Sequence, residues 1–427
     1  MNQFWVILTY LLSSLTSFSQ ISSDIIKTDF VLYQHRVDFD KHMREQLING
    51  SFAQTLDSNT EEKYREACWA ISQFLLQSSE IEQGFLKLFE KYNTLEMATK
   101  RAFLEAVYGA YPFVYEKEIE RLISNETNPK LFAIQALYLY RNNSSNANTG
   151  KILQQIEKQF KNYQETIVLS ELENYMVTHH TLAGSQTPDI SLLFGQQKIL
   201  GQKIIYSFQR WNRDYPGLAI IQYADGSFAK DTVGKLLSFQ QLARSASDLP
   251  YFITNGSTPQ GIYSIQGTEV SHNNFIGPTP NIQLIMPNET DSLFWHTPYD
   301  SSNDALTNYL HLLPTAWQSY YPMQEAFIAG KTGRTEIIAH GTTIDPDYFK
   351  DKPYYPLTPT LGCLCAKELW NIFNGQFLES DQFKMANAFL LTPLKIGYLM
   401  VINLDNQDKP VAAEEIEKVV KQFELKK

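Results

Sequence analysis

Two of the three cysteines in this 427-residue chain, Cys363 and Cys365, stand in one short segment, "TPTLGCLC". Gly362 directly precedes Cys363, so no side chain obstructs the backbone beside that thiol. A free thiol titrates at about 8.5 and needs a neighbouring base to act as a nucleophile at neutral pH. His340 is a candidate base, because it ends the segment "EIIAH", which is typical of a strand. His340 at a predicted strand end and Cys363 in a loop can meet in space, although 23 positions separate them.

Glycines flank both candidate residues. Gly362 precedes the nucleophile, and Gly341 follows the histidine. Where a side chain is missing, a substrate carbonyl can approach the backbone, and N–H groups near Cys363 can face the oxyanion that develops during attack. We therefore assign Gly362 and Gly341 to the backbone that faces the oxyanion.

A third segment, "NGSTPQGIYSIQG", places Thr258, Pro259 and Gly261 before a predicted strand. Proline and glycine are typical of the turn that leads into such a strand. From the residues alone, a plain turn is as good an interpretation as contact with a substrate.

Taken in order, the three segments resemble the catalytic domain of the L,D-transpeptidases. The family pattern is T-P-x-G-x-[FY]-x-[IV], then a strand ending in H-G, then [ST]-x-G-C, and all three stand within residues 195–427. The resemblance implies that Cys363 attacks the amide between an L-centre and a D-centre of a peptidoglycan stem peptide. It also implies that His340 takes the thiol proton, that a thioester forms, and that no metal or organic cofactor takes part. The motif residues that it places near the substrate are Thr258, Pro259, Gly261 and Thr360.

The chain departs from the family pattern at three points. Leu361 stands where the family commonly has histidine, and Cys365 stands where it commonly has arginine. An arginine could contact a carboxylate, whereas a thiol cannot do so as a charge pair. An additional segment, "DPDYFKDKPYYPL", lengthens the interval between His340 and Cys363. Substrate recognition is therefore less well defined by the sequence than the nucleophile is.

Cys365 has several interpretations. In a strand it would face the same side as Cys363, whereas in a helix the two thiols would diverge. It could be a small residue packed behind the site, which we favour. It could also cap Cys363 as a redox-active disulfide, or pair with Cys68.

The N-terminal residues predict export. Residues 1–19 contain a short apolar run followed by small residues, which is typical of a secretory signal peptide. That run is too short to span a bilayer, so we expect no transmembrane anchor. The expected location is across the inner membrane, in the periplasm or associated with the cell wall. The formal net charge of −10 opposes contact with phosphate backbones, so we expect no nucleic-acid partner.

Residues 25–185 predict an all-α domain. Asn128 and Pro129 provide a typical helix start. Alanine-bearing helices recur at loose intervals, which fits either a stack of helical hairpins or an unrepetitive bundle, and such a domain could bind protein partners. One apolar helical stripe predicts that the Cys68 thiol is buried and inert. The stripe consists of Tyr64, Cys68, Ile71 and Leu75.

Residues 195–427 predict a β-rich domain, because short β-branched and aromatic runs such as "QKIIYSF" alternate with turn residues. Within it, the segment 287–331 predicts an inserted group of helices, with Ser301 and Asp304 as a capping box. The aromatic residues of this segment could form a small core, which we favour, or could cover the substrate cleft as a lid. These residues are Trp295, Tyr299, Trp317 and Tyr320.

The sequence thus predicts a multidomain α and β protein, with an N-terminal helical domain followed by a β-rich domain similar to the L,D-transpeptidases. The predicted function is that of an exported cysteine transpeptidase, an acyltransferase that forms or remodels peptidoglycan cross-links. A carboxypeptidase or a hydrolase would use the same thioester. The alternative from a different class is a catalytically degenerate protein that binds or scaffolds the cell wall.

Overall fold

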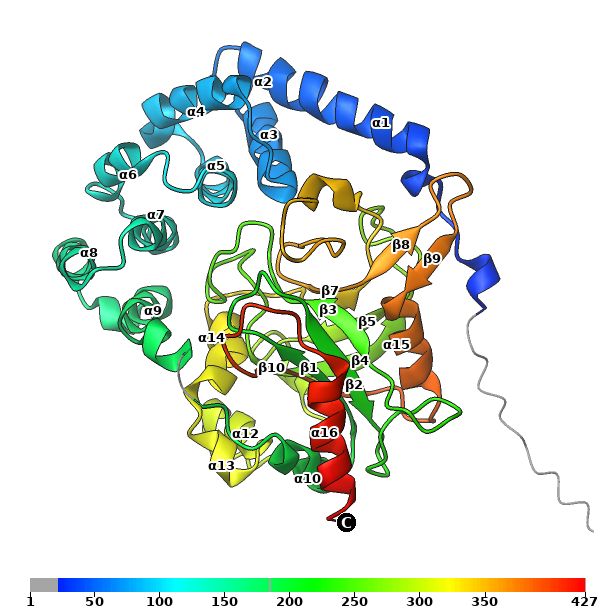
Figure 1. Ribbon diagram of the computed structural model, residues 1–427. Helices are drawn as coiled ribbons and strands as arrows, with labels where there is room; N and C mark the ends of the chain where they lie inside the picture. The colour runs from blue at the N-terminus through cyan, green and yellow to red at the C-terminus, as the bar shows by residue number, and fades with distance from the viewer. Residues whose placement is uncertain (1–21, 184–185, 427) are drawn as a thin grey trace, which may run out of the picture.

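The computed structural model describes residues 22–183 and 186–426, so the predicted signal peptide at 1–19 lies outside the described residues. Helices lie mostly in the N-terminal half, and the second half contains a closed barrel of eight strands (Figure 1). The expectation of helices followed by a β-rich part is confirmed at this level. No helix among the described residues has the length and apolar character to cross a membrane.

The N-terminal helices form an arc along one side of the barrel (Figure 1). Within the arc, α3 packs against α5, α5 against α7, and α7 against α9, while α8 contacts both α7 and α9. Neighbour-to-neighbour packing of this kind is that of a stacked array of helical hairpins. The helices are α1 (Tyr33–Lys41), a π-helical segment (His42–Asn49), α2 (Gly50–Ala53), α3 (Glu61–Phe74), α4 (Ser79–Lys91), α5 (Met97–Ala110), α6 (Glu116–Ile123), α7 (Pro129–Asn142), α8 (Asn146–Gln159) and α9 (Ile167–Ala183).

Local sequence explains several of these helix ends. Asn128 caps α7 by accepting hydrogen bonds from the N–H groups of Lys130 and Leu131, and Pro129 occupies the first turn, as predicted. The predicted stripe around Cys68 is confirmed for the residues inside α3. Leu75 lies just beyond that helix, because it adopts a left-handed backbone conformation that ends it.

The barrel strands follow the spatial order β1-β10-β4-β5-β6-β7-β3-β2. Strands β1 and β10 pair in parallel, as do β6 and β7, and the other neighbours are antiparallel. The strands are β1 (Lys203–Gln209), β2 (Gly217–Gln222), β3 (Phe239–Leu242), β4 (Gly261–Glu269), β5 (Asn281–Ile285), β6 (Ala339–His340), β7 (Leu364–Ala366) and β10 (Gly397–Asn403). A separate hairpin consists of β8 (Glu368–Trp370) and β9 (Phe377–Ser380).

Both faces of the barrel sheet are packed, so every residue of β1, β2 and β10 is buried. One face carries Ile204 and packs with α10 (Ser191–Leu200), α16 (Ala413–Glu424) and part of the 287–331 segment. The other face carries Ile205 and packs with α15 (Asp381–Leu390). Adjacent residues of β1 therefore belong to different cores, as alternation along a strand requires.

The 287–331 segment is helical, as predicted, and contains α11 (Asp291–Phe294), α12 (Ala305–His311), α13 (Thr315–Gln318) and α14 (Glu325–Lys331). Asp304, and not Ser301, caps α12 by accepting the N–H of Thr307 at 2.9 Å. Trp317 is fully buried in the core that the segment shares with the barrel. Its burial supports the packing interpretation of this aromatic residue over a role in covering a cleft.

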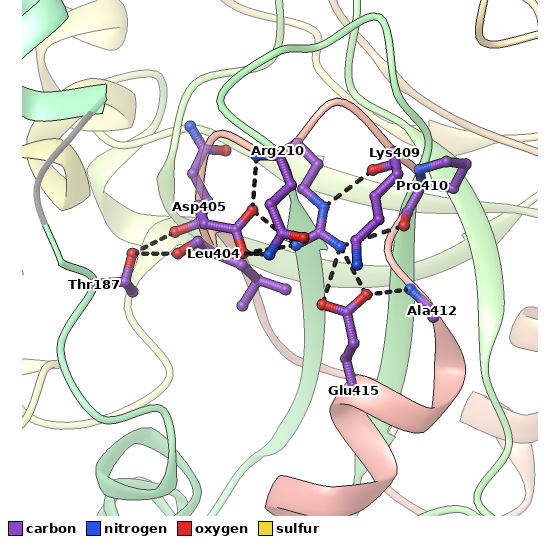
Figure 2. Close-up of polar contacts among 10 residues, drawn as sticks. Thr187, Arg210, Leu404, Asp405, Lys409, Pro410, Ala412 and Glu415 are labelled. Carbon is purple, nitrogen blue, oxygen red and sulfur yellow. Dashed lines mark hydrogen bonds and ion pairs between the residues drawn. The ribbon is translucent and has the colours of Figure 1, made fainter.

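A buried arginine joins the ends of the two parallel strands β1 and β10 (Figure 2). Arg210 follows β1, and its guanidinium pairs with Asp405 after β10 at 2.9 Å and with Glu415 on α16 at 2.7 Å. Thr187, in the connection between α9 and α10, donates its hydroxyl to the carbonyls of Asn403 and Leu404. These contacts fix the segment that immediately follows Arg210.

The helical array and the β-rich half share one hydrophobic core. The additional segment between His340 and Cys363 contributes to it, since Phe349, Tyr354 and Leu357 pack with residues of the array. Polar contacts reinforce this docking: Asp345 pairs with Arg36 at 2.9 Å. The longer interval in the sequence therefore has a structural reason, which is that the additional segment holds the array. The residues that the β-rich half contributes are Leu242, Leu249, Phe252, Ile253, Ile344, Phe349, Tyr354 and Leu357.

Candidate active site

Two short parallel strands bring the predicted nucleophile and base to one side of the barrel sheet. His340 in β6 pairs with Cys365 in β7, and Ala339 pairs with Leu364. Ala339 and Leu364 both lie in the core beneath α15. His340 and Cys365 therefore face the opposite side, and alternation along the chain places Cys363 on the same side as Cys365.

Cys363 is the more accessible of these two thiols, since it is partly exposed whereas Cys365 is fully buried. Its thiol donates to the carbonyl of Glu336, with 3.6 Å between sulfur and oxygen. Thr360 makes two hydrogen bonds within the loop that contains Cys363. Its hydroxyl donates to the carbonyl of Cys363 at 2.8 Å and accepts the N–H of Gly362 at 3.0 Å. The predicted motif residue Thr360 thus fixes the backbone on both sides of the predicted nucleophile.

Gly362 is required by its conformation and by its surroundings. Its φ is +117°, a region that favours glycine. A Cβ at this position would come within 2.4 Å of Nη2 of Arg334 and within 2.8 Å of the carbonyl oxygen of Gly256. Thr258 completes the support by donating its hydroxyl to the carbonyl of Gly362 at 2.9 Å. Two predicted residues from distant segments are therefore in direct contact beside the nucleophile.

Arg334 is a site residue that the sequence motifs did not indicate. It is 4% exposed, and its guanidinium donates to the carbonyls of Tyr251, Gly256 and Ser257. It lies against Gly362, and its positive charge partly opposes the rise that burial causes in the pKa of the Cys363 thiol. An arginine shortly before the histidine strand is the only signal in the sequence, and it belongs to no motif considered above.

The imidazole of His340 is buried and held in one tautomer. Its Nδ1 faces the carbonyl oxygen of Gly341, so Nδ1 carries the proton and Nε2 is left as the basic nitrogen. Burial lowers the pKa of His340 to about 4, so the ring is neutral at neutral pH. Within the described part of the chain, no hydrogen bond joins this imidazole to the Cys363 thiol, which bonds to Glu336 instead.

Gly341 makes room for a buried carboxylate. A Cβ there would come within 2.1 Å of the carboxylate of Glu368. That carboxylate accepts the N–H of Thr342 at 2.8 Å and the hydroxyl of Ser380 at 2.5 Å, and burial raises the pKa of Glu368 to about 7. Gly341 therefore supplies a carbonyl to His340 and space to Glu368. Its assignment to oxyanion-facing backbone remains a prediction.

The Cys363 thiol and the His340 imidazole are both neutral at neutral pH. Burial, the largest effect, raises the pKa of Cys363, and a backbone contact at Ile338 and the charge of Arg334 oppose it only in part. This direction is opposite to the one expected from an adjacent charged imidazole. Since His340 is also neutral, these pKa directions favour proton transfer during attack over a preformed thiolate.

Pro259 and Gly261 have structural roles. The carbonyl of Pro259 accepts the hydroxyl of Tyr263 at 2.7 Å. Gly261 has a φ of +134°, and a Cβ there would come within 2.5 Å of the Tyr309 hydroxyl. Gly261 therefore allows the 287–331 segment to pack on the start of β4.

All three cysteines are free thiols. Cys365 is fully buried, 3.7 Å from the Thr358 hydroxyl, and burial raises its pKa to about 12. Cys68 is fully buried too, and burial raises its pKa. These features support the interpretation of Cys365 and Cys68 as packed, unreactive residues.

No group of three or more potential metal ligands occurs among residues 22–183 and 186–426. No protein-family model matches the chain, and searches of curated proteins and of solved structures return no significant match. The resemblance to the L,D-transpeptidases therefore rests on the residues of the three segments.

Proposed function

We propose that this protein is a cysteine acyltransferase of the L,D-transpeptidase type that acts on peptidoglycan stem peptides after export. The observation that carries the proposal is the contact between motif residues from separate segments. Thr258 binds Gly362 beside Cys363, and His340 lies on the strand next to the one that Cys363 leads into. A structural role alone does not require an accessible thiol and a neutral imidazole on one side of the same sheet.

In the proposed reaction, the sulfur of Cys363 forms a bond to the carbonyl carbon of the scissile amide. Nε2 of His340 takes the thiol proton as the bond forms, and the carbonyl oxygen becomes an oxyanion near the backbone of Gly362 and Cys363. The C–N bond then breaks, and His340 returns the proton to the departing amine. An amine from a second stem peptide, or water, attacks the thioester and regenerates the thiol.

The test is intact-mass analysis of the protein after incubation with muropeptides that carry tetrapeptide stems. We expect a covalent adduct with the mass of the acyl part of the stem. The matched control is Cys363→Ser, which keeps the size of the side chain but is far less ionised at neutral pH. An adduct on the wild-type protein that Cys363→Ser also forms would contradict the proposed nucleophile.

Product analysis separates the enzyme alternatives. New cross-links indicate transpeptidation, shortened stems indicate a carboxypeptidase, and loss of existing cross-links indicates a hydrolase. The binding or scaffolding alternative is favoured by Leu361 and Cys365, which replace common family residues. That alternative predicts sedimentation of the protein with cell-wall sacculi and no adduct under any condition.

A further inference from the structure

A cavity lies between the helical array and the β-rich half, separate from the residues of the candidate active site other than Thr258. Its volume is about 320 Å³, at the lower end of the range for small-ligand sites. The array contributes Tyr108, Arg141 and Tyr175 to its lining. The β-rich half contributes Trp211 and Arg213, which follow the buried Arg210 of Figure 2, together with Thr258.

Several side chains that line this cavity have polar atoms without a partner. Nε of Arg141, Nε1 of Trp211 and Nη1 of Arg213 are donors shielded from solvent with no hydrogen bond among the described residues. Oδ1 of Asn403 is an acceptor in the same situation. Buried polar groups are almost always paired in folded proteins, so a cluster of unpaired ones around a cavity indicates that a polar ligand is missing.

Among the described residues, the two arginines of the cavity form no close ion pair. Neither Arg141 nor Arg213 has a carboxylate within 4.0 Å among the residues that the structure describes. Arg213 donates to the carbonyl of Thr258 at 3.2 Å, and Arg141 stacks on the ring of Tyr108 with 3.7 Å to its centroid. Glu325 and Asp248 act on Arg213 from a greater distance. Guanidinium groups that form no close ion pair can bind a carboxylate or a phosphate.

The acidic side chains of the lining select between those two anions. Asp248 accepts the hydroxyl of Ser257 at 3.3 Å, and Glu325 accepts the N–H and the side-chain amide of Gln260 at 2.9 and 3.1 Å. Both acidic groups line the cavity, and Asp248 also pairs with Arg244 at 3.8 Å. Burial raises the pKa of Glu325 to about 7 and that of Asp248 above its ordinary value. In their ionised forms the two groups would repel a phosphate and attract an ammonium group. The rings of the lining offer further contacts for a cation. A ligand with one carboxylate and one ammonium group fits this arrangement.

We infer that the cavity binds a free α-amino acid, whose carboxylate contacts Arg141 and Arg213 and whose ammonium group faces Asp248 and Glu325. Because each half of the protein supplies one of the arginines, the ligand joins the array to the β-rich half. Thr258 connects this site to the loop of the predicted nucleophile. Its carbonyl accepts a hydrogen bond from Arg213, and its hydroxyl donates one to the carbonyl of Gly362. The inference does not depend on the reactivity of Cys363.

Isothermal titration calorimetry of the full-length protein with D-alanine and with L-alanine tests the inference. The Cys363→Ser variant is used, so that no covalent reaction contributes heat. We expect saturable binding of at least one of the two. Arg141→Gln and Arg213→Gln should each weaken it at least tenfold. The matched control is Arg121→Gln, because Arg121 is exposed on α6 and does not line the cavity.

Inorganic phosphate and acetate are titrated in parallel. Acetate should bind more weakly than alanine, since it lacks the ammonium group. Phosphate should not compete with alanine for the cavity. Absence of alanine binding, equal binding by Arg213→Gln, or tighter binding of phosphate would each overturn the inference. If Arg213→Gln fails to fold, Arg213→Lys replaces it, with weaker alanine binding as the expected result. An unchanged affinity in that variant would count against the site.

Discussion

His340 stands opposite Cys365, and not opposite Cys363, in the parallel pairing of β6 with β7. The imidazole is therefore not directly opposite Cys363, which lies immediately before β7. The thiol of Cys363 meanwhile bonds to Glu336. In the proposed reaction, the thiol must therefore turn from that carbonyl toward Nε2 of His340.

The pH dependence of acylation follows from the buried imidazole. Because the pKa of His340 is lowered to about 4, Nε2 is unprotonated above that pH and is available to take the thiol proton. This availability is lost only as the pH falls through about 4 and the ring becomes protonated. We expect adduct formation with a muropeptide or a carbapenem to have its acid limb near pH 4. Rates measured between pH 3.5 and 8 check this, and a limb near the ordinary histidine pKa of about 6.5 would contradict the burial of the ring.

Removal of the base should slow the reaction without removing the nucleophile. His340→Ala should lower the rate of acylation at pH 7 by about 100-fold or more, the usual scale for a general base. His272, which is exposed and lies outside the site, provides the control variant His272→Ala. Equal acylation rates in the two variants would mean that another group takes the thiol proton.

The two neighbouring thiols should differ sharply in reactivity. Cys363→Ser should abolish covalent labelling, whereas Cys365→Ser should retain most of it, because Cys365 is fully buried and its pKa is raised to about 12. Peptide mapping of the labelled protein locates the modification. Label on Cys365 with Cys363 unmodified would reverse the assignment of the nucleophile.

Gly362→Ala should damage the site, since it forces a side chain into a left-handed conformation and against Arg334. We expect a loss of about 1–3 kcal/mol in the free energy of unfolding, together with reduced labelling of Cys363. Gly150 in α8 is a matched control, because a Cβ there meets nothing within 4 Å. Gly150→Ala should raise the free energy of unfolding by up to about 1 kcal/mol. Urea denaturation of both variants makes the comparison.

A fragment that begins at residue 190 should not be soluble on its own. Removal of the array would expose apolar residues of the shared core, among them Phe252, Phe349 and Tyr354. The soluble fraction after expression and the labelling of Cys363 by iodoacetamide are the measurements. A soluble fragment with a reactive thiol would show that the array is dispensable for the site.

The sequence was sufficient to predict which segments meet, but not how they meet. Thr258, Gly362 and Cys363 belong to short motifs whose residues contact one another, so their proximity could be predicted. The register of His340 against Cys365 could not be predicted, because β6 and β7 are only two and three residues long and carry no alternating pattern. Arg334 was missed for another reason: it acts through carbonyls of a distant loop, and backbone acceptors leave no signature in a sequence.

The helical half was predictable as helices, since a cap and a proline mark the start of α7 and an apolar stripe marks α3. The docking of this half on the β-rich half could not be predicted. The segment that docks the array contains Phe349, Tyr354 and Leu357, and in the sequence it has the composition of a polar and proline-containing loop. Burial of such a loop depends on a partner surface that lies in a different part of the chain.

The pairing of β1 with β10 has a consequence for biosynthesis. The first strand of the barrel, Lys203–Gln209, lies beside the last, Gly397–Asn403, so the barrel cannot close while the ribosome is still making the chain. Until then one edge of β1 is open, and open strand edges promote aggregation. A product that ends before Gly397 would keep that edge permanently, and it would also lack the Asp405 and Glu415 carboxylates that neutralise Arg210. Quality-control proteases would therefore encounter such a product as an unclosed sheet with an unpaired internal charge.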